Sequence, residues 1–345
     1  MREQMHGGDI YRNEHVIDFS VNSNPLGTPA SVIRAVKESA EQIVHYPDTE
    51  CGKVREAISR FEAVPEREII CGNGAAELFY AIVAAVMPRK ALLVSPTFTE
   101  YERALRAFGS EIVYYELQRE NEFLLDKGIL GQITREMDLM FLCNPNNPTG
   151  QPVAKELVVQ ILKKCRMCGV LLVLDECFVD FLNEPWLYEA KEIRAEYQGL
   201  LIVKALTKLF AMPGLRFGYG ISANRQLLNR IEGVLQPWNV SVPAQAGAVA
   251  ALKDCEEYLE KTRTLVARER KYLVRAIKSL GYRVYGSRAN YVFFRGEEGL
   301  YEKALEAGFL IRDCRNYPGL NTGYYRISVR ERDENERMVA WLRKL

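Results

Sequence analysis

The chain has 345 residues, of which 48% are hydrophobic and 26% are charged, and its formal net charge is +1. This length and composition are typical of a globular protein with one large domain and a smaller one. The small net charge argues against nucleic acid or a membrane surface as a partner, because both attract basic proteins. Residues 1–14 are polar and no apolar run approaches the ~20 residues of a membrane helix, so we expect a cytoplasmic protein.

Eight cysteines raise the question of a metal site or of disulfides. Cys165 and Cys168 form a CxxC pair, but no second pair follows and no histidine lies near them in the sequence. A zinc site usually takes four ligands from paired clusters. We therefore expect no metal, and reduced thiols that pack as small apolar side chains.

Short apolar runs alternate with amphipathic stretches such as 155–168. The runs are nearly continuous in apolar residues, as in strands that helices cover on both faces. They lie at 68–71, 91–95, 139–143, 170–174, 200–203 and 217–221. This alternation predicts an α/β fold, with a large domain of residues 31–240 built on a mostly parallel sheet.

The pattern changes after Pro243. A long charged stretch at 255–280 favours a helix, and aromatic and β-branched residues at 282–285, 291–294 and 325–329 favour strands. We predict a smaller α+β domain that consists of residues 241–345 together with an N-terminal arm, 1–30.

Polar segments follow four of the predicted strands, at the carboxyl ends where open α/β sheets bind ligands. The glycine-rich turn 72–77 opens a helix and suits a phosphate, although such a turn alone is more often only a turn. Segment 144–150 contains three Asn and two Pro, which predicts a rigid turn with amides directed into a cleft. Asp175 ends a buried strand and needs a cation or a protonated ring nitrogen. Lys208 follows another, where desolvation lowers an amine's pKa and favours Schiff-base chemistry.

Several of these segments together resemble the fold-type I pyridoxal 5'-phosphate (PLP) enzymes over nearly the whole chain. The segments are HYPD, NPNNPTG, LDE, TKLFAMPGLRFGYG and YYRISVR, in that order. The resemblance implies PLP as the cofactor, bound by Lys208 as a Schiff base. Asp175 would pair with the pyridinium nitrogen so that the ring acts as an electron sink. Arg216 would clamp the cofactor phosphate in a bidentate manner.

The resemblance implies further cofactor contacts, which include the phosphate cup, a donor to the ring O3' and an aromatic residue stacked on the ring. They are Gly74, Ala75, Phe98, Asn147 and Thr207. Tyr46 resembles the tyrosine that reaches the neighbouring subunit's phosphate, which implies a homodimer. Phe178 and Ala205 depart from the family pattern. Phe178 lacks the hydroxyl that relatives donate to O3', and Ala205 lacks a phosphate contact that relatives make through Ser or Thr.

A finer resemblance concerns the reaction. The segments HGGDIY, FSVNSNPLG, QPWNVS, IRDCRNYPGL and RISVRERDEN are similar to those of the threonine-phosphate decarboxylases of the cobamide pathway. The related histidinol-phosphate aminotransferases are the alternative. The decarboxylase resemblance implies a small phosphorylated amino acid as the substrate, and the family resemblance implies that Arg326 holds the substrate α-carboxylate.

The substrate phosphate needs its own charged donors, because a dianion loses hydration in a closed site. Arg330 lies four residues after Arg326, so on one strand both would project from the same face. We expect Arg330 to bind the phosphate with His6, although an arginine at this position could equally form a surface ion pair. Asn24 and Asn147 complete the predicted substrate contacts.

Overall fold

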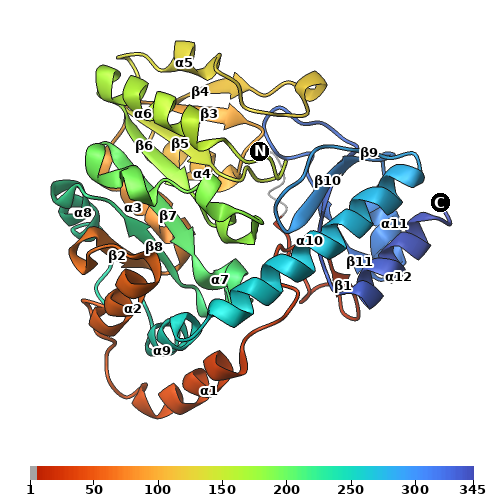
Figure 1. Ribbon diagram of the computed structural model, residues 1–345, viewed down its shortest axis with the longest axis horizontal. Coiled ribbons are helices and arrows are strands. Elements are labelled where there is room, and N and C mark those ends of the chain that lie inside the picture. The colour runs from red at the N-terminus through yellow and green to blue at the C-terminus, as the bar shows by residue number, and fades with distance from the viewer. Residues whose placement is uncertain (1–5) are drawn as a thin grey trace.

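A seven-stranded sheet forms the centre of the larger domain (Figure 1). The computed structural model describes residues 6–345. Strand β8 runs antiparallel to both of its neighbours, and the remaining pairs are parallel. In spatial order the strands are β2 (Ile69–Gly72), β8 (Gly218–Ile221), β7 (Leu200–Ala205), β6 (Leu171–Asp175), β5 (Leu139–Cys143), β3 (Lys90–Ser95) and β4 (Glu111–Glu116). The prediction of a mostly parallel sheet is confirmed.

Helices cover both faces of this sheet. Successive strand residues point to opposite sides, and in the central strands both sets are apolar and need to be buried. Within β6, Val173 packs in one apolar cluster, whereas Leu172 and Leu174 pack in another. The first cluster includes residues of α3 (Gly74–Val86), α4 (Thr99–Ala107) and α8 (Arg225–Glu232). The second includes residues of α2 (Gly52–Glu62) and α6 (Lys155–Cys168). Burial on both faces explains why the central strands lack polar alternation.

The edge strand β4 was not predicted from the sequence. Its residues are half-buried in the middle and exposed at both ends, where Glu111 and Glu116 stand. Its centre, Ile112 to Tyr115, is a run of apolar and aromatic residues that is bounded by a glutamate at each end, as suits a half-exposed edge strand.

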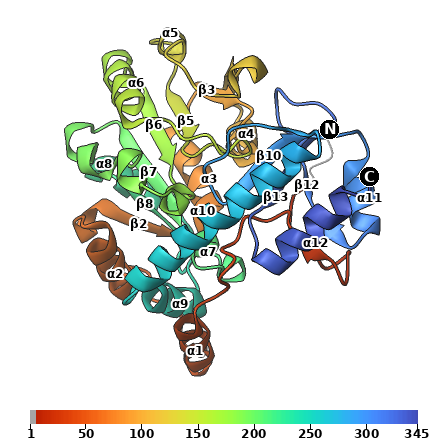
Figure 2. The ribbon, with the colours of Figure 1, turned by 45° about the vertical axis from the view of Figure 1, so that its right-hand side comes forward.

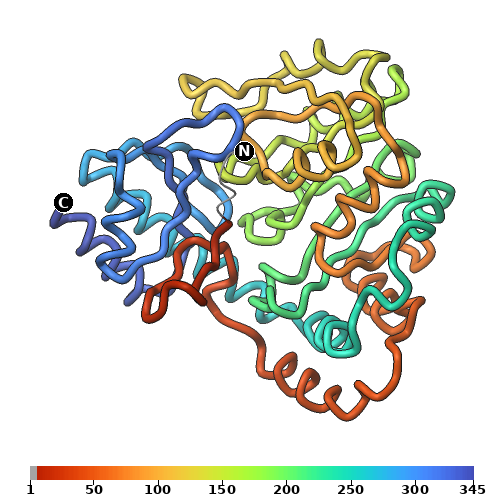
Figure 3. The backbone as a smooth tube through the Cα atoms, turned by 180° about the vertical axis from the view of Figure 1, so that it is seen from behind, coloured from red at the N-terminus to blue at the C-terminus, as the bar shows by residue number. Residues whose placement is uncertain are grey.

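The smaller domain contains a four-stranded antiparallel sheet. Its strands in spatial order are β12 (Arg312–Asp313), β13 (Tyr324–Ser328), β10 (Tyr291–Arg295) and β9 (Arg283–Val284). Figure 2 shows β10, β12 and β13 together, with α11 (Leu300–Glu306) and α12 (Arg332–Leu342) near the C-terminus. The N-terminal arm joins this domain, because β1 (Ile17–Asp18) pairs with β11 (Phe309–Leu310) (Figure 3).

The long helix α10 (Glu256–Ser279) leads from the larger domain to the smaller one (Figure 1). The helices that remain are α1 (Ala30–Ser39), α5 (Ile129–Gln132), α7 (Leu206–Leu209) and α9 (Val242–Leu252). Because α9 packs against α1 and α2, it lies with the larger domain although its residues follow position 240. The packing of α9 does not follow the predicted boundary at 240/241, and the division of the chain at 30/31 and 240/241 stays a prediction.

Among residues 6–345, none of the helices combines the length and the apolar character that a membrane span requires. The same part of the chain has no cluster of three or more His, Cys, Asp or Glu side chains placed to hold a metal ion. All eight cysteines are free thiols.

Candidate active site

A cavity of about 230 Å³ opens at the carboxyl ends of the parallel strands. Asp175 ends β6, Lys208 follows β7 within α7, and Phe98 and Asn147 follow β3 and β5. The smaller domain contributes Arg326 from β13. Chain segments far apart in the sequence therefore bring an amine, a carboxylate, an amide, an aromatic ring and a guanidinium to one small space.

One end of the cavity is shaped to hold a phosphate. Helix α3 begins at Gly74, whose φ is +80°, and a Cβ atom there would lie 2.6 Å from Nη2 of Arg216. The absence of a side chain at Gly74 thus makes room for this guanidinium. Ala75 and Thr207 line the cavity beside it. A helix N-terminus, a guanidinium and a hydroxyl together suit an anion.

The Lys208 amine lies among other positive groups. Loss of hydration lowers the pKa of Lys208 to about 8, and the positive charges of Arg326 and Arg216 add to this effect. An amine with this pKa is partly unprotonated at neutral pH and can attack an aldehyde. The structure therefore gives Lys208 the character expected of the residue that binds the cofactor.

Asp175 is buried, with 4% of its surface exposed. Its Oδ1 accepts a hydrogen bond from the backbone N–H of Cys177 at 2.9 Å, and its Oδ2 accepts one from the Tyr101 hydroxyl at 2.5 Å. Burial raises the pKa of Asp175, and the two donors oppose this rise. A carboxylate in this position is suited to a protonated ring nitrogen.

The turn from Asn144 to Gly150 directs only one of its three amides into the cavity, and the expectation for the other two is wrong. Asn144 donates to the carbonyl of Tyr188 and accepts from the backbone N–H of Val153. Asn146 donates to the carbonyl of Pro96 at 2.9 Å. These two amides stabilise the turn itself, and Asn147 lines the cavity.

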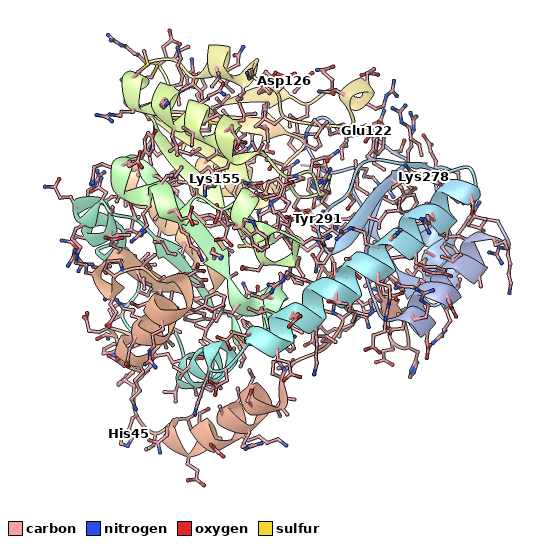
Figure 4. The ribbon with its side chains drawn as sticks, in the orientation of Figure 1. His45, Glu122, Asp126, Lys155, Lys278 and Tyr291 are labelled. Atoms are coloured by element: carbon pink, nitrogen blue, oxygen red, sulfur yellow. The ribbon has the colours of Figure 1, made fainter. Side chains whose placement is uncertain are left out.

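Asn147 has its amide orientation set by two donors. Its Oδ1 accepts hydrogen bonds from Nη1 of Arg326 and, at 3.4 Å, from the hydroxyl of Tyr317. Within residues 6–345 the Nδ2 group of Asn147 has no hydrogen-bond acceptor, so it is free to donate to a ligand in the cavity. Arg326 also donates to the carbonyl of Ser20 at 2.7 Å and lies 5.4 Å from the ring centre of Tyr291. Figure 4 shows Tyr291 where β10 approaches the larger domain.

Arg330 lies outside the residues that line the cavity, and its predicted position is wrong. Strand β13 ends at Ser328, so Arg330 does not continue the strand face of Arg326. Its guanidinium instead donates two hydrogen bonds of 2.9 Å to Glu334, in the first turn of α12. Arg330 is therefore an ion-pair residue, which was the alternative to a phosphate contact.

Asn24 and Tyr46 also lie outside the cavity lining. Asn24 is buried and donates to the carbonyl of Leu209 and the hydroxyl of Thr262, both at 2.7 Å. It therefore joins α7 to α10. Tyr46 is 76% exposed and stacks on Trp238 at 4.3 Å between ring centres. Its neighbour His45 lies at the lower edge of the molecule (Figure 4).

Arg312 and Asn22 are among the cavity-lining residues that could not be predicted from the sequence. Arg312 is 4% exposed and lies directly opposite Arg326 in the pairing of β12 with β13. Residues opposite each other in an antiparallel pair share one face. The segment IRDCRN contains this arginine, but the two-residue strand β12 has no signal of its own in the sequence.

His6 lines the cavity from the N-terminal arm, as expected of a substrate contact. Its Nε2 lies 3.1 Å from Nη1 of Arg103 and 3.5 Å from a carboxylate oxygen of Glu100. Burial lowers the pKa of His6, and the nearby Glu100 carboxylate opposes this change. An arriving dianion would favour the protonated imidazole.

Comparisons with known proteins agree with this geometry. Residues 14–342 match the family described as aminotransferase class I and II. The chain belongs to this family. Its members use PLP, and the cavity fits that cofactor through the Gly74–Arg216 cradle, the Lys208 amine and the Asp175 carboxylate.

Individual relatives carry two different names. A threonine-phosphate decarboxylase of Salmonella typhimurium is 35% identical, with 99% of this chain and 96% of the relative covered. A histidinol-phosphate aminotransferase of Desulfitobacterium hafniense is 31% identical, with 99% and 96% covered. The solved histidinol-phosphate aminotransferase of Clostridium acetobutylicum superposes with a TM-score of 0.88 at 30% identity, covering 94% of this chain and 98% of that one. A further aminotransferase structure, from Sinorhizobium meliloti in complex with PLP, shares the fold at 22% identity, with a TM-score of 0.86 and coverage of 99% and 95%.

Proposed function

We propose that the protein decarboxylates L-threonine O-3-phosphate to (R)-1-aminopropan-2-yl phosphate, a step of cobalamin biosynthesis. The observation that carries this proposal is the placement of Arg312 opposite Arg326 in one cavity of about 230 Å³. Two buried guanidinium groups suit a small substrate with two anionic groups, because each lost hydration shell needs charge-assisted donors in return.

Each polar residue of the cavity has a separate role in this reaction. Arg326 binds the carboxylate, while Arg312 and His6 bind the phosphate. PLP supplies the electron sink that weakens a bond at the substrate Cα. Lys208, with a pKa of about 8, can hold a proton and return it to Cα after CO2 has left. By fixing the orientation of the two anionic groups, Arg326, Arg312 and His6 would favour decarboxylation over transamination.

A two-part assay tests the proposal. Threonine phosphate is supplied with and without 2-oxoglutarate, and CO2 and the amine product are measured. The proposal requires CO2 release without an amino acceptor. A strict need for 2-oxoglutarate without CO2 release would instead support the alternative, a histidinol-phosphate or related aminotransferase, which the Desulfitobacterium relative's name favours.

We also propose that the protein acts as a homodimer in which Tyr46 contacts the cofactor phosphate in the cavity of the partner subunit. Tyr46 lies outside the cavity of its own chain, and its stack with Trp238 is accessible to solvent. Ile43 and Val44, next to it, are 68% and 78% exposed. Exposed apolar side chains of this kind mark an interaction surface.

A further inference from the structure

The hydroxyl of Tyr101 donates to Oδ2 of Asp175 at 2.5 Å. Tyr101 is fully buried and is not among the residues that line the cavity, whereas Asp175 is. The other oxygen of Asp175 accepts from the Cys177 backbone at 2.9 Å. Both oxygens thus have a fixed donor, and the plane of the carboxylate cannot rotate freely.

Aromatic neighbours hold the Tyr101 ring in place. It stacks on Phe141 with 4.9 Å between ring centres, and it meets Phe79 and Phe98 edge to face at 4.9 and 5.6 Å. Phe98, the predicted stacking partner of the cofactor ring, precedes α4, and Tyr101 lies three residues later in its first turn. One short segment therefore carries the stacking residue and the donor to Asp175.

The titratable groups that face Asp175 are neutral near pH 7. Burial raises the pKa of Tyr101 well above its usual range, and burial also raises those of Cys143, Cys177 and Tyr291, which face the same carboxylate. All four stay protonated near neutral pH. A hydrogen bond from a neutral donor stabilises the charged form of a carboxylate and opposes its protonation.

We propose that Tyr101 is a positioning residue that keeps Asp175 ionised and oriented toward the ring nitrogen of the cofactor. Without the hydroxyl, the buried carboxylate competes more strongly for the proton that it shares with the ring. This inference goes beyond the proposed reaction: it depends on PLP and holds for a decarboxylase and for an aminotransferase.

The test compares wild type with Tyr101→Phe, which removes only the hydroxyl. We measure the dissociation constant of PLP and the pH midpoint of the cofactor's visible absorption in the holoenzyme. Tyr101 acts on PLP only through Asp175, so the variant should bind PLP about threefold to tenfold more weakly, the equivalent of half a pKa unit to one unit. A less protonated ring makes the nitrogen that links it to Lys208 more basic, so the midpoint rises by roughly half a unit to one unit.

Tyr219 offers a matched control. Its hydroxyl also donates at 2.5 Å to a buried carboxylate, Glu62, and neither residue lines the cavity. Tyr219→Phe should lower stability without moving the absorption midpoint. A second variant carries 3-fluorotyrosine at position 101, which preserves the ring and strengthens the donor, and should move the midpoint downward. If the midpoints of both position-101 variants equal that of wild type, the proposal is overturned.

Discussion

Arg312 and Arg326 are cross-strand partners, directly opposite each other in the antiparallel pairing of β12 with β13. Like charges in such a pair repel, so the arrangement needs other groups to stabilise it. Arg312 donates to Asn316 and to the carbonyl of Asp313, both at 2.8 Å, and Arg326 donates to the Ser20 carbonyl. The pair is therefore held in place before an anion binds.

Arg312→Ala should weaken the use of threonine phosphate. The loss of a charged hydrogen bond to the phosphate predicts a kcat/KM lower by roughly tenfold to a hundredfold. The ratio of kcat/KM for threonine phosphate to kcat/KM for threonine should fall by a similar factor, because threonine has no phosphate for Arg312 to bind. Steady-state kinetics with both substrates measure this.

Arg330→Ala is the matched control, since Arg330 pairs with Glu334 outside the cavity lining. It should leave the substrate preference unchanged. The assignment of the phosphate to Arg312 fails if Arg330→Ala narrows the preference and Arg312→Ala does not.

The contrast between these two arginines shows what the sequence allows one to predict. Lys208, Asp175 and Asn147 follow buried strands whose apolar runs are readable, so their shared edge of the sheet could be predicted. Arg312 reaches the cavity through strand pairing across a hairpin, and pairing between segments is not encoded in local periodicity. The predicted position of Arg330 was wrong because β13 ends at Ser328, four residues before α12 begins, and the sequence does not mark that end.

Lys208→Ala should abolish the covalent link to the cofactor. Wild-type protein with PLP should show a visible absorption band that borohydride fixes to the chain, because the amine of Lys208 is the proposed attachment point. Lys155→Ala, at a residue paired with Glu192 away from the cavity lining, should keep the band. Peptide mapping after reduction identifies the modified lysine, and a label elsewhere would reject the assignment.

The stability of the cofactor-free protein should depend on Lys208 and pH. Its pKa is about 8 in the folded chain, below the ordinary value of 10.5. Between these values the unfolded chain binds the extra proton, so stability rises with pH across this window. The contribution is on the order of 3 kcal/mol. Lys208→Met should lack this rise, and urea unfolding at pH 7 and pH 10 compares the two proteins. Parallel changes in both would contradict the prediction.

Shared active sites predict complementation between two inactive variants. Mixing Lys208→Ala with Tyr46→Phe subunits produces heterodimers with one site that has both native residues. At equal amounts and full exchange, activity should approach about a quarter of wild type. Native mass spectrometry confirms the exchange, and a mixture no more active than its parents would count against Tyr46 serving the partner.

Lys204 should be important for stability, because it belongs to a buried ionic cluster with Glu62 and Asp180. Lys204, on β7 four residues before Lys208, lies 2.8 Å from Glu62 and 3.1 Å from Asp180. Glu62 is fully buried, and the nearby ammonium groups of Lys204 and Lys191 lower its pKa to about 2 despite burial.

Lys204→Met leaves both carboxylates without this partner, and breaking a buried pair in this way costs roughly 3–5 kcal/mol. Urea unfolding at pH 7 measures the loss. The double variant Lys204→Met with Glu62→Gln removes one orphaned charge and should recover part of it. In wild type the Glu62 contribution is present above pH 4.5, the ordinary pKa, and is lost as pH falls toward 2. Equal stability of wild type and Lys204→Met at pH 7 would show that the cluster does not depend on this ammonium group.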